Sequence, residues 1–172
     1  FCSAPHALVI DDRTTHGRPD LATANNASGN VSILIGNGNG TFAAKVDYTA
    51  GSGPHSVRAG DLTGDGRPYL VVANDGSSSV SVLRNNGNGT FAAKVDYTVG
   101  WAPHSVDTVD LNNDGRPDLA PANTASGNVS ILIGHGNGHF AAKVDYTATS
   151  RPPHFHAGAV TAHGRPDPLA DN

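Results

Sequence analysis

The sequence predicts an all-β protein: a β-propeller of four-stranded blades, with three full blades plus a partial fourth. Three observations point to this fold class. The chain repeats itself every 49 residues, each repeat contains four short strand patterns, and no segment shows the 3.6-residue periodicity of a helix with caps. Four short strands in about 49 residues is the spacing of a propeller blade. We therefore expect almost no helix.

The repeat is clearest in one segment that occurs three times. GNGTFAAKVDYTA at 38–50 returns as GNGTFAAKVDYTV at 87–99 and as GNGHFAAKVDYTA at 136–148. The flanking sequences align at the same offset without gaps. The chain is therefore predicted to be one repeat domain over 1–172, with units at 4–52, 53–101 and 102–150 and a partial unit at 151–172.

Within the second unit, turns rich in Gly, Asn and Asp separate runs of strand-forming residues. The predicted strands are Ser56–Leu62, Tyr69–Ala73, Ser79–Arg84 and Phe91–Val99, joined by turns at Thr63–Arg67, Asn74–Ser78 and Asn85–Thr90.

Runs such as Val31–Ile35, interrupted only by Ser32, and Ile131–Ile133 are apolar on successive residues. A strand exposed on one face would alternate, so these runs favour a sheet packed between two neighbouring sheets. The phenylalanines that begin the fourth strand of each unit should lie buried between blades: Phe42, Phe91 and Phe140. A β-sandwich or a β-solenoid built from the same strands is the alternative fold.

Composition excludes several classes of protein. The net charge is −4 and Lys and Arg are scattered singly, so no basic surface for nucleic acid is expected. No apolar run approaches the ~20 residues of a membrane helix. The only cysteine, Cys2, rules out an intrachain disulfide framework and a cysteine-based zinc site. Since the chain lacks Met, we expect a processed mature form or a fragment.

The loop between the first two strands of the third unit carries oxygen side chains at alternating positions. Oxygen ligands at positions 1, 3, 5 and 9 with Gly115 at position 6 would surround a hard cation such as Ca²⁺. The loop resembles an EF-hand loop over its first half only, because Pro121 stands where an EF-hand has Glu. The predicted ligands are Asp110, Asn112, Asp114, the carbonyl of Arg116, and Asp118.

The pattern DLNNDGRPDLAPAN, with PHSV before it and GNGTF after the third strand, resembles the FG-GAP/VCBS repeat family. That resemblance implies an integrin-α-type β-propeller with Ca²⁺ held in the loop between the first two strands of a blade. It covers nearly the whole chain, most specifically at 102–150. The family's ligand positions fall on the five residues of the third unit named above.

The other copies of the loop depart from this pattern. In unit two, Tyr69 replaces the last carboxylate, which should lower the affinity. In unit one, His16 supplies imidazole, a poor calcium ligand. An ion-free Asx-rich turn is the alternative for every copy. The corresponding positions are Asp61, Thr63, Asp65 and Arg67 in unit two; Asp12, Thr14, Arg18 and Asp20 in unit one; and Ala159, Thr161, His163, Arg165 and Asp167 in unit four, where no metal is expected.

Two further sets of residues recur at fixed repeat positions. His6, His55 and His104 precede the first strand pattern of their units, and a hydrogen bond from blade to blade would explain their recurrence. Four aromatic residues could form stacking surfaces for a ligand, although the tyrosines fit an inter-blade core better: Trp101, Tyr48, Tyr97 and Tyr146.

These observations favour a secreted, non-enzymatic, calcium-stabilised propeller used for recognition. Membership of the family would imply carbohydrate binding or adhesion, and several similar units would give multivalent binding of a glycan or glycoprotein. No catalytic residue and no particular sugar-binding residue is predicted. The alternatives are a scaffold propeller attached to a secreted enzyme, or an enzyme with its site in the central channel. Self-association or membership of a larger propeller is expected, because the fourth unit has only two strands.

Overall fold

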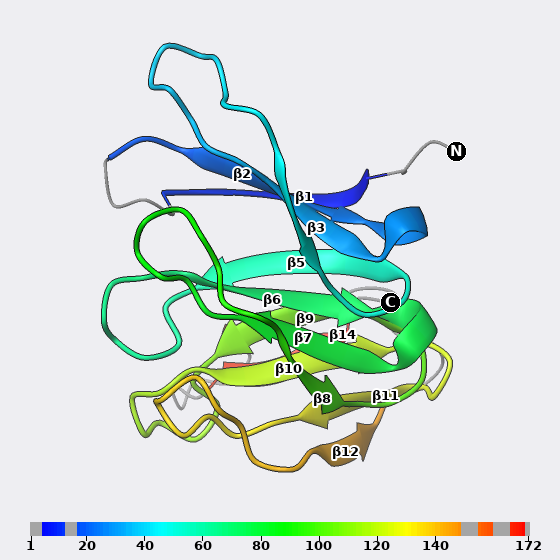
Figure 1. Ribbon diagram of the computed structural model, residues 1–172. Coiled ribbons are helices and arrows are strands. Elements are labelled where there is room, and N and C mark those ends of the chain that lie inside the picture. The colour runs from blue at the N-terminus through cyan, green and yellow to red at the C-terminus, as the bar shows by residue number, and fades with distance from the viewer. Residues whose placement is uncertain (1–4, 13–16, 149–154, 160–165, 171–172) are drawn as a thin grey trace.

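Three four-stranded antiparallel sheets form the body of the molecule, one for each full repeat (Figure 1). The computed structural model describes residues 5–12, 17–148, 155–159 and 166–170. Each sheet is a simple meander in chain order. The strands are β1 (Pro5–Asp11), β2 (Asp20–Asn25), β3 (Asn30–Leu34) and β4 (Val46–Thr49); β5 (Pro54–Gly60), β6 (Tyr69–Asn74), β7 (Ser79–Leu83) and β8 (Val95–Thr98); and β9 (Pro103–Val109), β10 (Asp118–Asn123), β11 (Asn128–Ile131) and β12 (Val144–Thr147).

The sheets stack face to face, and their first strands lie side by side, β1 against β5 and β5 against β9 (Figure 1). A two-stranded sheet of β13 (Phe155–Ala159) and β14 (Pro166–Ala170) continues the array, with β13 against β9. The partial fourth unit thus forms the two strands that its sequence predicts.

The predicted burial of strands on both faces is confirmed in the middle of the array. Every residue of β6, β7 and β10 is buried. Apolar side chains of adjacent units interlock: Ala22, Val31 and Ile33 of the first sheet share a core with Leu70 and Phe91 of the second. A second core joins the second and third sheets.

The phenylalanine prediction is right for two residues and wrong for one. Phe91 and Phe140 are buried, whereas Phe42 is 39% exposed. Phe91 packs edge to face on Tyr48 of the preceding unit, and Phe140 packs in the same way on Tyr97. Each of these two rings therefore packs against the unit before its own. Phe42 belongs to the first unit, and among the described residues no earlier unit packs against it.

The fourth strands are shorter than predicted. In unit two, Phe91 forms only an isolated bridge with Asn85, and the ladder with β7 resumes at Val95. The first strand of that unit begins two residues earlier than predicted, at Pro54. Helix in the described residues is limited to two single 3₁₀ turns, η1 (Asn26–Ser28) and η2 (Asp75–Ser77), as expected.

Candidate metal centre

The loop of unit three, between β9 and β10, is wound around the carboxylate of Asp110. This carboxylate accepts the backbone N–H groups of Asp114 at 3.2 Å and Gly115 at 2.8 Å. Gly115 has φ of 80°, a left-handed conformation that favours glycine, and it permits the turn. The first position of the predicted ligand set therefore organises the loop.

The next two predicted ligands contact each other within the same loop. The side-chain oxygen of Asn112 accepts the N–H of Asp114 at 2.9 Å, and its amide nitrogen lies 3.2 Å from Oδ2 of Asp114. Oδ1 of Asp114 accepts the N–H of Arg116 at 2.9 Å. Asn112, Asp114 and Arg116 are exposed, so a solvated cation could reach their oxygens.

Asp118, at the last predicted position, is fully buried at the start of β10. One of its oxygens accepts the N–H of Leu111 at 2.9 Å, which ties Asp118 to the loop. The other accepts the N–H of Gly134 at 2.8 Å. Gly134 leaves no room for a side chain, because a Cβ there would lie 2.1 Å from the carbonyl oxygen of Pro117. Asp118 thus joins three segments of the unit.

Unit two has the same loop without the final carboxylate. Asp61 accepts the N–H groups of Thr63, Gly64 and Gly66 at 3.0, 2.8 and 2.7 Å. Burial raises the pKa of Asp61, but these N–H groups outweigh it and hold the pKa below its ordinary value. Asp65 accepts the N–H of Arg67 at 2.9 Å.

Tyr69 occupies the position of Asp118 in unit two and has a different environment. It is buried in the core between the second and third sheets, together with Leu119 and Phe140. Tyr at this position packs between the sheets and offers no carboxylate. Unit two therefore has one fewer candidate calcium ligand than unit three.

Unit one is described only in part. Asp12 accepts the N–H of Gly17 at 2.6 Å, and the buried Asp20 accepts the N–H of Gly36 at 2.8 Å, as Asp118 does with Gly134. Thr14 and His16 lie outside the described residues. In unit four the backbone places Ala159 in β13 and Asp167 in β14, while the other three positions lie outside the described residues.

The donor chemistry fits a hard cation, since the side-chain donors of unit three are all oxygens. In the part of the chain that the structure describes, however, no three acidic, histidine or cysteine side chains are grouped around one point. The carboxylates of Asp110 and Asp114 belong to the loop, whereas that of Asp118 is buried at the first residue of β10. The loop brings the first three ligands together and connects the last one through Leu111.

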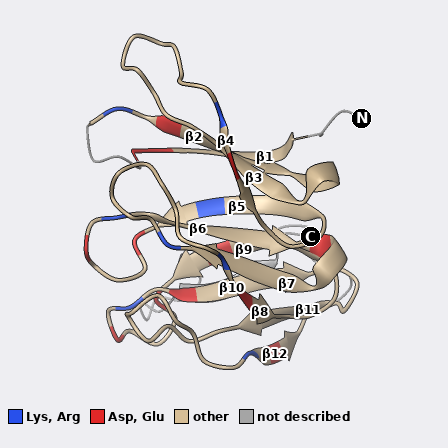
Figure 2. Cartoon of the chain, viewed as in Figure 1, with Lys and Arg blue, Asp and Glu red and all other residues tan. Residues whose placement is uncertain are grey.

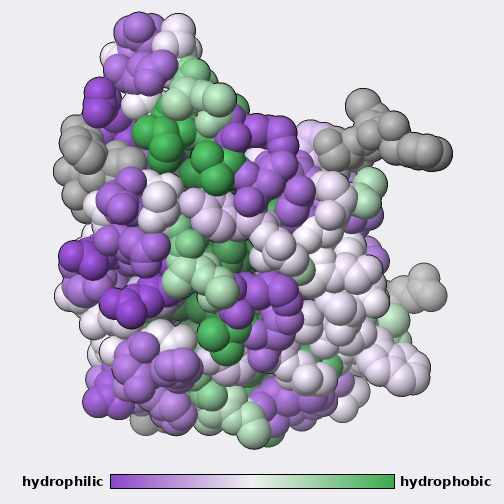
Figure 3. All heavy atoms as spheres, viewed as in Figure 1, coloured by the Kyte–Doolittle hydropathy of each residue, from purple (hydrophilic) through white to green (hydrophobic). Residues whose placement is uncertain are grey.

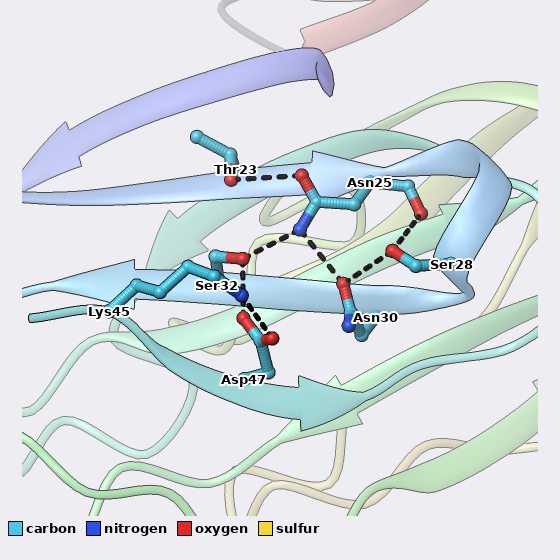
Figure 4. Close-up of polar contacts among 7 residues, drawn as sticks. All are labelled: Thr23, Asn25, Ser28, Asn30, Ser32, Lys45 and Asp47. Atoms are coloured by element: carbon cyan, nitrogen blue, oxygen red, sulfur yellow. Dashed lines mark hydrogen bonds and ion pairs between the residues drawn. The ribbon is translucent and has the colours of Figure 1, made fainter. Parts of the chain in front are cut away.

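A second polar system, which the sequence reasoning missed, crosses each sheet, and Figure 4 shows its copy in unit one. In unit one, Asn25 of β2 donates to Ser32 of β3 at 2.7 Å, and Ser32 donates to Asp47 of β4 at 2.6 Å. Lys45 forms an ion pair with Asp47, and hydrogen bonds from Lys45 and Ser32 hold the pKa of Asp47 below its ordinary value. The equivalent sets are Asn74, Ser81, Asp96 and Lys94 in unit two and Asn123, Ser130, Asp145 and Lys143 in unit three.

The signal for this system was present in the repeat. Asn closes each second strand pattern, Ser occupies the third and Asp the fourth, always 49 residues apart. The Asn and Ser residues are buried and the Asp residues are exposed, and they are hydrogen-bonded to one another, so they act as structural links between strands. The Asn–Ser–Asp network therefore recurs at the end of the second strand in each full unit.

The predicted hydrogen bond between blades through the recurring histidine is confirmed. The Nδ1 atom of His55 lies 3.1 Å from the carbonyl oxygen of His104 in the next unit. The rings of these two residues stack at 4.2 Å between centroids, and His6 meets His55 edge to face at 5.0 Å.

The aromatic residues predicted as stacking surfaces lie in two different environments. Tyr48 and Tyr97 belong to the inter-sheet cores, while Trp101 and Tyr146 are exposed.

Charged groups on the visible face are dispersed and do not form a basic surface (Figure 2). Six of the charged residues form three Lys–Asp ion pairs at the start of the fourth strands, and the two charges of each pair neutralise each other. No described helix is long and apolar enough to cross a membrane.

Comparisons with known proteins agree on the fold. The FG-GAP-like repeat family matches residues 12–72 and 61–120, which together make up more than half of the chain. A comparison with curated protein sequences gave no match.

Among solved structures, the fold is similar to that of BBS1N in its complex with ARL6DN, with a TM-score of 0.63 and 15% identity. It is also similar to hydrazine synthase of Kuenenia stuttgartiensis, with a TM-score of 0.60 and 18% identity. The alignments cover 92% and 88% of this chain but only 48% and 38% of those chains. The chain thus spans less than half the length of these β-propeller proteins, and the predicted fold class is confirmed.

Proposed function

The chain belongs to the FG-GAP-like repeat family, and from this premise we propose that it is a secreted, calcium-stabilised propeller that recognises carbohydrate and has no catalytic activity of its own. The single observation that carries the calcium part is the loop of unit three. Its Asp110, Asn112 and Asp114 side chains are already organised by hydrogen bonds within five residues.

In this proposal Asp110, Asn112, Asp114 and the carbonyl of Arg116 hold the ion, and Asp118 closes the site from β10. Calcium would neutralise carboxylates that the fold brings into one loop, and so it would fix the connection between the first two strands of the unit. Unit two, with Asp61, Thr63, Asp65 and Arg67, would bind more weakly because it lacks the last carboxylate. Unit one would contribute through Asp12, Thr14 and Asp20.

Secretion follows from the same reasoning. Sites with exposed ligands and few carboxylates suit the ~10⁻⁴–10⁻³ M affinities of extracellular calcium-binding modules. Those affinities require millimolar calcium, which is found outside cells.

Carbohydrate recognition is supported by repetition and by surface chemistry. Near-identical units present near-identical surfaces, and weak contacts with a glycan could add up to useful avidity when several chains are displayed together. The nearly neutral pairing of Lys and Asp on the fourth strands favours an uncharged polar ligand over nucleic acid.

A glycan array tests this function. The protein, immobilised at high density in millimolar calcium, should bind a defined subset of glycans, and EDTA should reduce that binding. Absence of binding to every glycan, with the protein folded and calcium-loaded, would overturn the carbohydrate proposal and favour a scaffold role beside a secreted enzyme.

A further inference from the structure

We propose that a single neutral sugar ring binds in the groove between the first and second sheets, and that His139 closes the equivalent groove one unit further on. This inference rests on the proposed carbohydrate recognition and assigns its site. The groove has a volume of about 340 Å³ and lies where β4 faces the hairpin that leads into β8. Its lining includes Tyr48, Thr49, Leu83, Phe91, Ala92 and Lys94.

The size and shape of the groove suit a small ligand. Its volume is at the lower end of the ~300–1,000 Å³ range of small-molecule sites. Buried Leu83 and Phe91 form an apolar floor, and Tyr48 stands edge to face against Phe91 at 5.5 Å between ring centroids. Figure 3 shows the same pattern on the surface: hydrophobic residues emerge along the stacked hairpins between bands of hydrophilic ones.

The rim of the groove carries charged residues, and each is neutralised by an ion pair. Asp47, which also lines it, is paired with Lys45, and Lys94 is paired with Asp96. Of these four residues Asp47 and Lys94 line the groove, so an anion would meet the carboxylate of Asp47 and a cation the ammonium group of Lys94. A neutral polyol can accept hydrogen bonds from Lys94 and donate to Asp47 while its apolar ring face rests on the floor, so this chemistry favours a sugar.

The equivalent position between the second and third sheets differs in one hairpin residue, His139. There the hydroxyl of Tyr97 lies 3.4 Å from Nδ1 of His139, so a contact spans from β8 to the hairpin of unit three. In the first groove Thr90 occupies the position of His139. Its hydroxyl is used inside its own loop, 2.6 Å from Asn88 and 2.9 Å from Asn86.

The repeat itself supplies matched variants. Thr90→His gives the first groove the residue of the second, and His139→Thr does the reverse. Each new residue already occurs at that loop position in another unit, so both changes are compatible with the fold. Thr90→Ser is the control, because it keeps a small hydroxyl at the mouth.

The experiment is NMR titration of the ¹⁵N-labelled protein in calcium with the methyl pyranosides of glucose, galactose, mannose, fucose and N-acetylglucosamine. At least one sugar should shift the amides of Thr49, Ala92 and Ala93 with one site per chain. Thr90→His should weaken this binding by about tenfold or more, a difference of about 1.4 kcal/mol or more, while Thr90→Ser should not. His139→Thr should add shifts at Thr98, Ala141 and Ala142 and raise the stoichiometry to two.

Two outcomes would overturn the inference in distinguishable ways. If array binding persists in Thr90→His and no sugar shifts the groove amides, the glycan binds elsewhere, and the proposed function survives without this site. If neither the array nor the titration shows binding, the proposed function and the site fail together.

Discussion

The histidine that recurs at one repeat position shows how the backbone conformation determines the direction of a side chain. In each full unit the register of the first strand shifts at this residue, so His6, His55 and His104 stand at β-bulges. A bulge leaves its extra residue out of the ladder and redirects its side chain. The three imidazoles consequently meet across the first strands of adjacent sheets instead of entering the core.

Stability should fall in mild acid because of this stack. Burial, with the adjacent His104, lowers the pKa of His55 below its ordinary value of 6.5, whereas the backbone carbonyl of His104 and Asp75 act in the opposite direction. Since the pKa is lower in the folded state, the contribution is complete above pH ~6.5 and is lost as the pH falls through the folded pKa. Melting temperatures between pH 8 and 5 should show this loss, and His55→Gln should reduce it. An unchanged pH dependence in His55→Gln would refute this role.

Two phenylalanines at the same repeat position should differ sharply in their contribution. Phe91→Ala removes a buried ring from the first inter-sheet core and should cost about 3–5 kcal/mol of unfolding free energy. Phe42→Ala, at the exposed equivalent, is the matched control and should cost less than about 1 kcal/mol. Urea denaturation of both variants measures the difference. Equal losses would mean that the inter-unit packing described above is wrong.

Among the secondary-structure elements, the second and third strands were the most predictable from sequence. They lie between two sheets, so both of their faces are buried: β6 is apolar over five successive residues, Tyr69–Ala73, and β7 combines apolar residues with small serines. The fourth strand was overestimated because Ala92 and Ala93 continue the strand-like pattern after Phe91 without pairing in the ladder. Pairing there depends on contacts with the neighbouring unit, because Phe91 packs in the core that units one and two share.

The candidate site was predictable in part. Spacing alone identified the carboxylates that wrap each loop, such as Asp61 and Asp110, because those hydrogen bonds are local. The burial of Asp118 and its bond to Gly134 depend on a partner 16 residues away. The Asn–Ser–Asp network depends on strand register, which a single sequence specifies only after the strands have been paired.

The Asn–Ser–Asp network should hold each sheet together. Ser81→Ala would leave the buried amide of Asn74 and the carboxylate of Asp96 each without one hydrogen bond. The expected cost is about 1–3 kcal/mol, the penalty for unsatisfied buried polar groups. The control is Ser52→Ala at an exposed loop position. If urea denaturation shows similar stability for the two variants, the network is not a stabilising element.

For the whole molecule, the outer face of the first sheet is an incomplete interface. Leu8, Ile10 and Phe42 are 55%, 61% and 39% exposed, while Val57 and Phe91, at the repeat positions of Leu8 and Phe42, are buried against the preceding sheet. The face therefore has the residues of an inter-sheet contact. Apolar surface of this kind favours association.

The 172-residue chain should accordingly self-associate. Light scattering in calcium should give a mass above 17.5 kDa that rises with concentration, and Ile10→Asp should lower it by placing a charge on the exposed face. A monomer of 17.5 kDa at all concentrations, with cooperative melting, would show that this face needs no partner and that the array is stable alone.

Calorimetric melting with calcium against EDTA tests the central claim most directly. Saturation at 100 times the dissociation constant adds about 2.7 kcal/mol, so calcium should raise the melting temperature of the wild type by several degrees. Asp114→Ala removes one of three carboxylates of the fullest site and should abolish most of that rise, and magnesium at equal concentration should not replace calcium. Identical melting of the wild type in calcium and in EDTA would contradict the account.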